Sequence, residues 1–501
     1  MLTRPESLAR TMIATPGRCG RGRVWPIPRP DEERDDSTDH ERSETISHIA
    51  ARLLESDVAL SDPQWRRNEL APGLGAGVAF IFEDHSEIPL SSPDSHTLEY
   101  RMSWFARETD IVGLAGERVP AFERYLAEDL ALGRFEVIET VSRSAMPLAL
   151  RLGNDPSVLH HLAARADSAG GLTLVPYISS MSVWRLGERL AELSGQSVRV
   201  VGPPPHLTDR VNNKLWFAQR VRELLGTGAL PATHVASDER ELTTHIETLA
   251  PRGGRLVVKV PSGSGGRGIV TFDASVMSPG RAHAMVDWLQ RELGTSGWDG
   301  SYPLVVGEWD APVIASPSVQ AWIPDTGSPI IGEVFDQVFD AHRFVGACVT
   351  ELPIGVQTRL RADAAHLAEL LQRLGYFGPC SFDSVLVGSN PLTAKVHWLE
   401  CNGRWGGVST ALAAVRRCAG IRPDRPFVVL QSEARLAGQR TFDEVLKVLG
   451  DEVFQRRSDG TGALILSPRR VMSGAGLNLV VVARSQAEAR DSAVRILARF
   501  S

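Results

Sequence analysis

Lysine is the charged residue that this chain has least of. Its 54 basic residues include only four lysines, Lys214, Lys259, Lys395 and Lys447. Arginine does not replace the compact ammonium of lysine where a small point charge is needed. A lysine retained in such an arginine-rich chain is therefore a candidate for a chemical role.

Cysteine and long apolar runs are also scarce. The five cysteines show no paired spacing of the kind found in zinc or redox motifs, and so few in 501 residues favour a reducing compartment. No apolar run approaches the roughly 18 residues that a membrane-spanning helix needs. The net charge of −6 argues against a nucleic-acid or anionic-membrane binder. We therefore expect a cytoplasmic protein with neither nucleic acid nor membrane as a partner.

The chain divides into four parts by composition and pattern. Residues 1–44 are rich in Pro, Arg, Asp and Glu without periodicity, which predicts a disordered extension. Residues 45–205 alternate strand-like and helical stretches, which is typical of an α/β domain with a largely parallel sheet. Residues 206–425 form the third part, and residues 426–501 predict a small α+β unit.

Within the second part, the predicted strands are 78–82, 111–114, 172–179 and 198–201, and the predicted helices are 121–132, 156–166 and 182–193. Pro203 to Pro205 would close this part as a stiff linker. Beyond them, Thr208 and Asp209 can cap a helix that runs to Leu225. Lys214 would lie in its first turns, where backbone N–H groups favour an anion.

A glycine-rich hairpin follows. Residues 255–268 predict a buried strand that carries Lys259 and leads into a loop, with a second strand over 269–272. The loop holds Ser262, Gly263, Ser264, Gly265, Gly266 and Gly268. Glycine lets successive N–H groups turn toward an anion with no Cβ atom in the way. The alternative is an ordinary solvated loop, and the neighbouring Lys259 favours phosphate binding.

An acidic hairpin lies further on. Two apolar strands, 381–387 and 395–402, flank a loop centred near Pro391. Asp383 and Glu400 are about equally far from Pro391, so they should be neighbours on adjacent strands. Asn402 is two residues beyond Glu400 and leaves the same face. Two opposed carboxylates in an apolar hairpin would repel each other if they had no cation, although each alone could face solvent.

These three side chains predict a magnesium site. Mg²⁺ prefers hard oxygen ligands and completes its shell with water and phosphate oxygens. Cys401, between Glu400 and Asn402, is expected to point to the opposite face and to serve packing rather than catalysis.

The order of these residues resembles the ATP-grasp superfamily over roughly residues 206–425. Lys214 on a helix, Lys259 before a glycine-rich hairpin, Glu308 at a strand end, Asp383, and Glu400-Cys401-Asn402-Gly403-Arg404 follow one another as in that family. The preceding domain, with Leu174-Val175-Pro176-Tyr177-Ile178-Ser179-Ser180, resembles the pre-ATP-grasp domain of pheganomycin-type peptide ligases, which act in natural-product biosynthesis. The resemblance implies a pre-ATP-grasp α/β domain, two α+β subdomains that clasp ATP with a lid over about 231–308, and a small C-terminal unit.

The resemblance also implies roles. Lys214 and Lys259 should hold the α and β phosphates of ATP, and residues 262–268 should form the lid loop. The adenine and ribose pocket should be lined by Glu308, Trp309 and Asp310. Mg²⁺, with Mn²⁺ as an alternative ion, should be held by Asp383, Glu400 and Asn402. Arg404 should face the γ-phosphate and the acyl phosphate, which makes Arg404 and Lys259 the expected catalytic residues.

Two positions depart from the family pattern. Ser316 and Pro317 stand where many relatives have an acidic residue, which leaves Asp310 as a candidate for the ribose contact. Ser381 stands where many relatives have arginine, so Arg343 or Arg359 could substitute for it.

The implied reaction is an ATP-dependent ligation. The carboxylate of a small amino-acid-like acid attacks the γ-phosphate, and the amine of an amino acid or peptide then displaces phosphate to form an amide. The alternatives are carboxylation, thioester formation or phosphotransfer at the same nucleotide site, and a non-catalytic nucleotide-binding protein. The oligomeric state stays open, and analogy with relatives suggests a homodimer.

Overall fold

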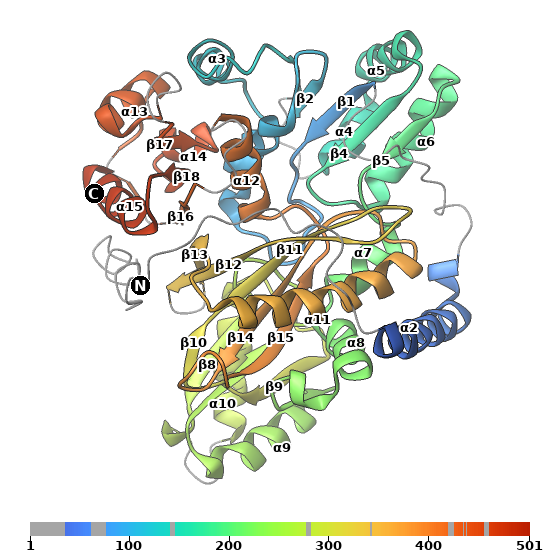
Figure 1. The fold of residues 1–501 in the computed structure, drawn as a ribbon, viewed down its shortest axis with the longest axis vertical. Coiled ribbons are helices and arrows are strands. Elements are labelled where there is room, and N and C mark those ends of the chain that lie inside the picture. The colour runs from blue at the N-terminus through green and yellow to red at the C-terminus, as the bar shows by residue number, and fades with distance from the viewer. Residues whose placement is uncertain are drawn as a thin grey trace.

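The computed structural model describes residues 36–61, 77–140, 146–276, 282–340, 343–418, 425–433, 435–436, 438–454 and 460–500. Its strands form three sheets. A five-stranded sheet with α4 to α6 lies at the top of Figure 1, a four-stranded sheet with α9 and α10 lies at the bottom, and the largest sheet lies between them. No helix among the described residues is both long and apolar enough to cross a membrane.

The N-terminal domain is built on a parallel sheet with strand order β3-β2-β1-β4-β5. Its strands are β1 (Val78–Phe82), β2 (Ile111–Leu114), β3 (Glu136–Glu139), β4 (Leu172–Pro176) and β5 (Val198–Val200). Its helices are α3 (Pro120–Arg124), α4 (Leu148–Asn154), α5 (Pro156–Ala169) and α6 (Met181–Ser194). The predicted parallel α/β domain is confirmed, and β1 and β2 have the predicted bounds.

Three elements of this domain differ from the prediction: one helix is shorter than predicted, and one strand and one 3₁₀ segment were not predicted. The helix predicted over 121–132 is shorter, because α3 passes at Tyr125 into a π-helical turn that ends at Asp129. Strand β3 was missed since it lies at the sheet edge and is only partly buried, so it has no apolar run. The third is a long 3₁₀ segment, η3 (Pro93–Phe105), most of whose residues are buried.

The segment after β5 packs against the N-terminal domain, so the three prolines do not form the separate stiff linker that was predicted. Pro203 and Pro205 are buried, and the carbonyl oxygen of Pro203 accepts hydrogen bonds from Ser179 Oγ at 2.8 Å and Trp184 Nε1 at 3.2 Å. The single helix predicted to end at Leu225 is two helices, α7 (Pro205–Val211) and α8 (Lys214–Leu225). Asn213 caps α8 through Oδ1, which places Lys214 at the first helical position.

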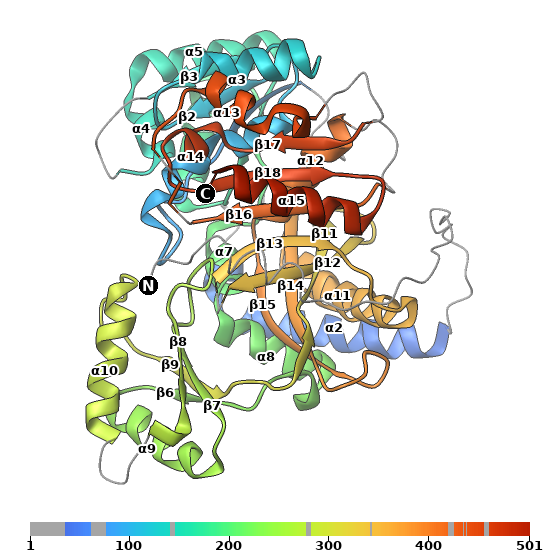
Figure 2. The same ribbon diagram turned by 90° about the vertical axis from the view of Figure 1, so that its left-hand side faces the viewer.

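A long helix precedes the N-terminal domain. Helix α2 (Asp36–Ser56) packs against α8 and α11 (Ile354–Arg373), as Figure 2 shows. Its apolar face is buried at Ile46, Ile49 and Leu53. It begins at Asp36, so the predicted disorder of residues 1–44 is wrong for residues 36–44. The remainder of that extension, residues 1–35, lies outside the described residues.

The four-stranded sheet has the order β6-β9-β7-β8 and corresponds to the predicted lid. Its strands are β6 (Thr233–Ala236), β7 (Arg255–Lys259), β8 (Ile269–Asp273) and β9 (Leu304–Glu308), with α9 (Glu239–Leu249) and α10 (Ala282–Thr295). Strands β7 and β8 form the predicted hairpin, with Lys259 opposite Ile269.

Nine strands of the described residues form the largest sheet. They are β10 (Val313–Ala315), β11 (Pro317–Ile323), β12 (Ile330–Asp340), β13 (Arg343–Val349), β14 (Gly378–Val387), β15 (Lys395–Asn402), β16 (Phe427–Ser432), β17 (Gly462–Ile465) and β18 (Leu477–Val482). Helix α11 packs on β11 and β12. The apolar stripe of α11 belongs to the core: Leu360, Ala364, Leu367, Leu371 and, just after the helix, Leu374 are all buried.

The C-terminal unit extends this sheet. Strand β16 pairs with β13, where Gly346 lies opposite Leu430, and β18 and β17 follow. Helices α12 (Gly407–Cys418), α13 (Phe442–Leu449), α14 (Pro468–Met472) and α15 (Gln486–Phe500) belong to this part of the fold. The boundary predicted at residue 425 therefore falls within one continuous sheet, whose buried residues share a core with the N-terminal domain.

Candidate active site

The acidic hairpin has the predicted register. Asp383 on β14 lies opposite Glu400 on β15, and Ser381 lies opposite Asn402. The pairing shifts by one residue between Asp383 and Ser384. This β-bulge compensates for the unequal distances of the two acids from Pro391, which is eight residues after Asp383 and nine before Glu400.

The two acids sit in different surroundings. Asp383 is 6% exposed and accepts hydrogen bonds from Ser318 Oγ at 2.7 Å, Gln337 Nε2 at 3.1 Å and Asn402 Nδ2 at 2.8 Å. Burial, together with the nearby Glu400, raises the pKa of Asp383 to about 6. Burial also opposes ionisation of Glu400, but Lys214 Nζ lies 2.7 Å from its Oε2 and lowers the pKa of this carboxyl overall.

Cys401 lies between these residues and faces away from them. It is 3% exposed and belongs to the apolar core that contains Phe382 and Trp398. The predicted packing role is therefore confirmed.

Two lysines from distant segments meet the acidic hairpin. Lys214 opens α8, and its backbone N–H donates to the carbonyl of Pro261 at 2.9 Å, which ties α8 to the start of the glycine loop. Lys259 ends β7, and its Nζ lies 5.8 Å from the centre of the Trp309 ring. Burial and the charge of Lys214 lower the pKa of Lys259, although Glu400 opposes this. The glycine-rich hairpin, which carries Lys259, and the acidic hairpin therefore share one cleft.

This cleft has a cavity volume of about 390 Å³. Most of the predicted site residues line it: Lys214, Lys259, Gly263, Ser264, Gly265, Gly266, Glu308, Trp309, Asp310, Asp383, Glu400, Asn402 and Arg404. Such a row of cationic, amide and carboxylate groups around one concave space suits a polyphosphate and its counter-ion.

Ser262 and Gly268 are placed elsewhere. Ser262 lines a second cavity of about 380 Å³ with Leu90 and the segment 297–303. The carbonyl of Gly268 accepts a hydrogen bond from the backbone N–H of Val260 at 2.8 Å, which closes the base of the loop. The structure thus puts the tip of the loop, residues 263–267, on the cleft and its base outside it.

Leu90 connects the N-terminal domain to the glycine loop. It lies in the turn between β1 and η3 and has a φ of +54°, a conformation that costs an ordinary residue about 1–2 kcal/mol. A Cβ atom built on Gly268 would lie 2.5 Å from Leu90 Cδ1, and one on Gly263 would lie 3.5 Å from it. The leucine therefore packs directly on the backbone of the loop, at positions where the loop has no side chains.

The predicted adenine and ribose residues already have protein partners. Glu308 forms an ion pair with Arg252 at 3.1 Å and is 42% exposed. Asp310 lies 3.0 Å from Nδ1 of His397. The part of His397 in this site was not predicted. A single histidine on an apolar strand is usually a core residue, and the β-bulge, which cannot be predicted from the sequence, sets the face on which His397 lies.

Arg404 also faces the cleft. Its Nη1 donates to Asn212 Oδ1 at 2.7 Å, and the backbone N–H of Gly403 donates to the same oxygen at 3.1 Å, so Asn212 fixes the turn after β15. Of the two arginines considered in place of Ser381, Arg343 lines the cleft. Arg359 donates to the carbonyl of Ala394 at 3.0 Å instead.

The donor set suits a divalent cation shared with a ligand. Asp383, Glu400 and the side-chain oxygen of Asn402 are hard oxygen donors on one face of the hairpin. Among the residues that the structure describes, no group of three or more Asp, Glu, His or Cys side chains gathers that could hold a metal ion. An ion here would therefore need oxygens from phosphate or water, as Mg²⁺ in nucleotide sites does.

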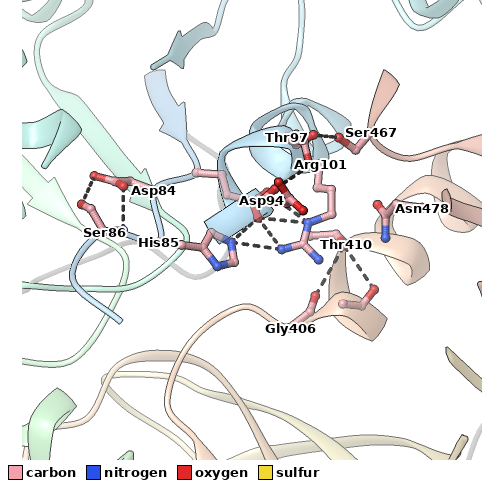
Figure 3. Close-up of polar contacts among 12 residues, drawn as sticks. Asp84, His85, Ser86, Asp94, Thr97, Arg101, Gly406, Thr410, Ser467 and Asn478 are labelled. Atoms are coloured by element: carbon pink, nitrogen blue, oxygen red, sulfur yellow. Dashed lines mark hydrogen bonds and ion pairs between the residues drawn. The ribbon is translucent and has the colours of Figure 1, made fainter. Parts of the chain in front are cut away.

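One polar cluster in the cleft was not predicted from the sequence. Glu83 and His85 follow β1, and Arg101 lies on η3, and all three side chains are almost fully buried. Figure 3 shows the guanidinium of Arg101 between His85 and the first turn of α12, which carries Thr410 and directly follows Gly406. A signal was present in the sequence, because ligands of parallel α/β sheets bind beyond the carboxyl ends of the strands, where Glu83 and His85 lie.

The four lysines allow a direct test of the cleft. Lys395 and Lys447 are exposed, whereas Lys214 and Lys259 line the cleft. With MgATP at about ten times its dissociation constant, acetylation of Lys214 and Lys259 should slow about 10-fold, because only unoccupied protein reacts. Acetylation of Lys395 and Lys447 should keep its rate. Peptide mass spectrometry measures each site, and equal rates at all four lysines would contradict nucleotide binding in this cleft.

The raised pKa of Asp383 predicts a pH-dependent stability. Because the pKa rises from 3.8 to about 6 on folding, the contribution of Asp383 to the stability of the protein without metal or nucleotide should fall as pH rises from about 4 to about 6. Two pKa units correspond to about 3 kcal/mol. The Asp383→Asn variant should lack this loss. Urea unfolding of both proteins at pH 4 to 7 measures it, and parallel pH profiles would show that the pKa is not raised.

Comparison with known proteins places the fold. Residues 99–192 match the family model of the pre ATP-grasp domain. The chain is similar to the ADP complex of purK, N5-carboxyaminoimidazole ribonucleotide synthetase, with 12% identity and a TM-score of 0.50 over 85% of this chain and 97% of that one. It is also similar to a biotin carboxylase β,γ-ATP complex from Campylobacter jejuni, with 13% identity and a TM-score of 0.50 over 82% of this chain and 88% of that one.

No curated protein sequence matches the chain. At 12% and 13% identity, the likeness to solved structures concerns the fold alone. The predicted fold class is confirmed: this chain has a pre-ATP-grasp domain in front of an ATP-grasp fold.

Proposed function

We propose that this protein is an ATP-dependent ligase that joins a small carboxylic acid to an amine of an amino acid or peptide. The observation that carries the proposal is the meeting of Lys214, Lys259 and the Asp383–Glu400 pair in one cleft. Ammonium groups next to paired carboxylates in one cleft suit a triphosphate with its magnesium ion.

Each cleft residue has a part in this proposal. Lys214 and Lys259 bind phosphate oxygens and neutralise their charge, which allows a second anion to approach the γ-phosphate. Arg404, held by Asn212, stabilises the charge on the phosphoryl group in transfer. Asp383, Glu400 and Asn402 would hold Mg²⁺, which would supply Lewis-acid polarisation of the phosphates.

The proposed reaction has two steps. A carboxylate oxygen attacks the γ-phosphorus and ADP leaves, which gives an acyl phosphate. The amine nitrogen then attacks the acyl carbon, phosphate leaves, and the nitrogen loses a proton to give the amide. The glycine loop over residues 263–267 excludes water from the acyl phosphate while the cleft is closed.

Carboxylation is the second candidate, and the fold likeness to purK and biotin carboxylase favours it. In that case bicarbonate would be the acid. A requirement of ADP release for bicarbonate, with no requirement for an organic acid, would select this alternative.

The deciding experiment is a pooled incubation. The protein is mixed with MgATP, a set of carboxylic acids and a set of amines, and the products are read by mass for the loss of one water between two substrates. Ligation predicts such a product together with ADP and phosphate in equal amounts. AMP with pyrophosphate, or ATP turnover equal to a protein-free control, would contradict it.

A further inference from the structure

The unpredicted cluster at the N-terminal-domain end of the cleft is organised around one arginine. Arg101 is 2% exposed, and its Nε lies 3.0 and 3.3 Å from the two carboxylate oxygens of Glu83. Its Nη2 also contacts Glu83 and lies 3.2 Å from Nε2 of His85. The ring of Tyr177 stacks on His85 and lies 5.1 Å from the guanidinium carbon. Two of the three guanidinium nitrogens are therefore committed to holding the group in place.

The third nitrogen faces the cleft. Nη1 lies 3.5 Å from Gln431 Oε1, which is longer than a good hydrogen bond. Gly407 lies opposite: a Cβ atom built there would be 3.3 Å from Gln431 Oε1 and 3.8 Å from Arg101 Nη1. Because this residue is glycine, the space in front of Nη1 stays open to the cleft, which Arg101, Gly407 and Gln431 all line.

The same space adjoins the start of α12, a helix of 12 residues. The first N–H groups of a helix have no partner within it and attract anions. Figure 3 shows the Arg101 guanidinium above this first turn. A buried guanidinium nitrogen and a helix start that face one cavity together make a site for an anion.

The charge balance limits the anion to a single negative charge. Glu83 neutralises Arg101, and Glu433, which lines the cleft, lies 3.4 Å from Arg470 and 4.0 Å from Arg343. Burial lowers the pKa of His85 and keeps its ring neutral. The single carboxylate of Glu433 balances only one of Arg470 and Arg343, and Arg404 has been assigned to the phosphates. One unbalanced positive charge suits a carboxylate better than the two negative charges of a phosphomonoester.

We propose that Arg101 Nη1 and the first turn of α12 bind the carboxylate of the acid substrate next to Arg404, so that the acid is a monocarboxylate without a phosphate group. This inference rests on the proposed function for the identity of the reacting group. Arg101, Arg404 and Gly407 line the same cleft, and Arg404 lies three residues before the start of α12, so the site adjoins the residue assigned to the γ-phosphate. A carboxylate there would lie where attack on that phosphate is possible.

The buried pair of Glu83 and Arg101 supports a binding role more than a stabilising one. Taking two charges out of water costs several kcal/mol per ion, and apolar residues of similar size often stabilise a fold as well. What the pair provides is a guanidinium whose orientation is fixed before the ligand arrives, which lowers the cost of binding.

Binding of defined probes tests the site. Calorimetry measures binding to the full chain with and without MgADP. The probes are monocarboxylic acids, including amino acids, and the primary amide of each acid as its uncharged control. Phosphoserine is the phosphomonoester probe. The wild type should bind at least one monocarboxylate and not its amide. The double variant Glu83→Gln/Arg101→Gln leaves no unpaired buried charge and should weaken that binding by about 10-fold to 100-fold. Its MgADP affinity should stay within about twofold of wild type.

Two further variants make the result specific. Arg435→Gln removes an arginine that is 66% exposed and lies 3.9 Å from Asp94, and it should leave carboxylate binding unchanged. Arg101→Lys keeps the charge but loses the planar fork, and should weaken binding while the chain still folds. An unchanged melting temperature with MgADP present confirms folding of either Arg101 variant.

Three outcomes would overturn the proposal: unchanged carboxylate affinity in both Arg101 variants, tighter binding of phosphoserine than of any monocarboxylate, or no binding of any monocarboxylate by the wild type. The proposed ligase activity fails by a different result. If the protein binds carboxylates through Arg101 but does not turn over MgATP, the proposed carboxylate subsite stands and the proposed ligase activity is refuted.

Discussion

Replacing Glu400 with alanine is expected to abolish magnesium-dependent turnover of ATP, with a loss of at least about 10²-fold to 10³-fold. Glu400 supplies one of the two carboxylates of the hairpin and orients Lys214 through their 2.7 Å contact. Its removal therefore weakens both the metal site and a phosphate ligand. ADP release at saturating MgATP and the pooled substrates measures the effect.

The fold of the Glu400→Ala variant should survive, because the side chain is 31% exposed and its partner Lys214 keeps access to water. Glu333→Ala is the matched control: it removes another glutamate of the same sheet whose partner, Arg416, lies 2.7 Å away on the surface. This control should keep full activity. Full activity in Glu400→Ala as well would refute the metal assignment.

Replacing Lys259 with methionine is expected to weaken MgATP binding by about 10-fold to 100-fold, because a charge-assisted hydrogen bond to phosphate is lost. The same change should leave the unliganded protein as stable as wild type or more so. Burial and Lys214 lower the pKa of Lys259, which means that its charge is held at a cost in the empty cleft. Methionine keeps the length of the chain and removes that cost.

Calorimetric binding of MgATP and thermal unfolding of the empty protein measure the two effects of Lys259→Met separately. Lys395→Met, at an exposed lysine of β15, is the control for affinity and stability. If Lys259→Met binds MgATP like wild type, Lys259 does not belong to the phosphate site. If its affinity falls only together with its melting temperature, the loss is one of folding.

The two hairpins could be predicted because their information is local. Alternating strands around a short loop bring Asp383 near Glu400 whatever the rest of the chain does. The exact register, however, depends on the β-bulge. Equal spacing about Pro391 would have placed Asp383 opposite Leu399, and only the bulge brings Glu400 into register. A bulge depends on packing across the sheet and leaves no clear pattern in the chain.

The Glu83, His85 and Arg101 cluster could not be assembled from the sequence in the same way. Arg101 lies on a 3₁₀ segment of 13 residues, whose side chains do not follow the 3.6-residue period used to recognise helices. Its partner Gln431 is 330 residues away, on a strand of a different sheet. Such a contact follows from how the N-terminal domain packs against α12 and β16, which is a tertiary property.

The helix cap of α8 shows a smaller failure of the same kind. Thr208 and Asp209 satisfy the residue preference for a cap, yet Asn213 holds that position, because α7 occupies the residues before it. Lys214 was nevertheless assigned to the correct helix end, since either cap leaves it within the first turns.

The position of Leu90 bears on how fast products leave. Leu90 follows His85 in one short turn and packs on the backbone of the glycine loop. If the four-stranded sheet moves outward, Leu90 must therefore lose its contact with the glycine loop. The loss of this apolar burial costs roughly 1.5–3 kcal/mol. Release of ADP would then limit the rate of the catalytic cycle. A smaller residue at position 90 would raise the turnover rate, and more of the acyl phosphate would be hydrolysed by water.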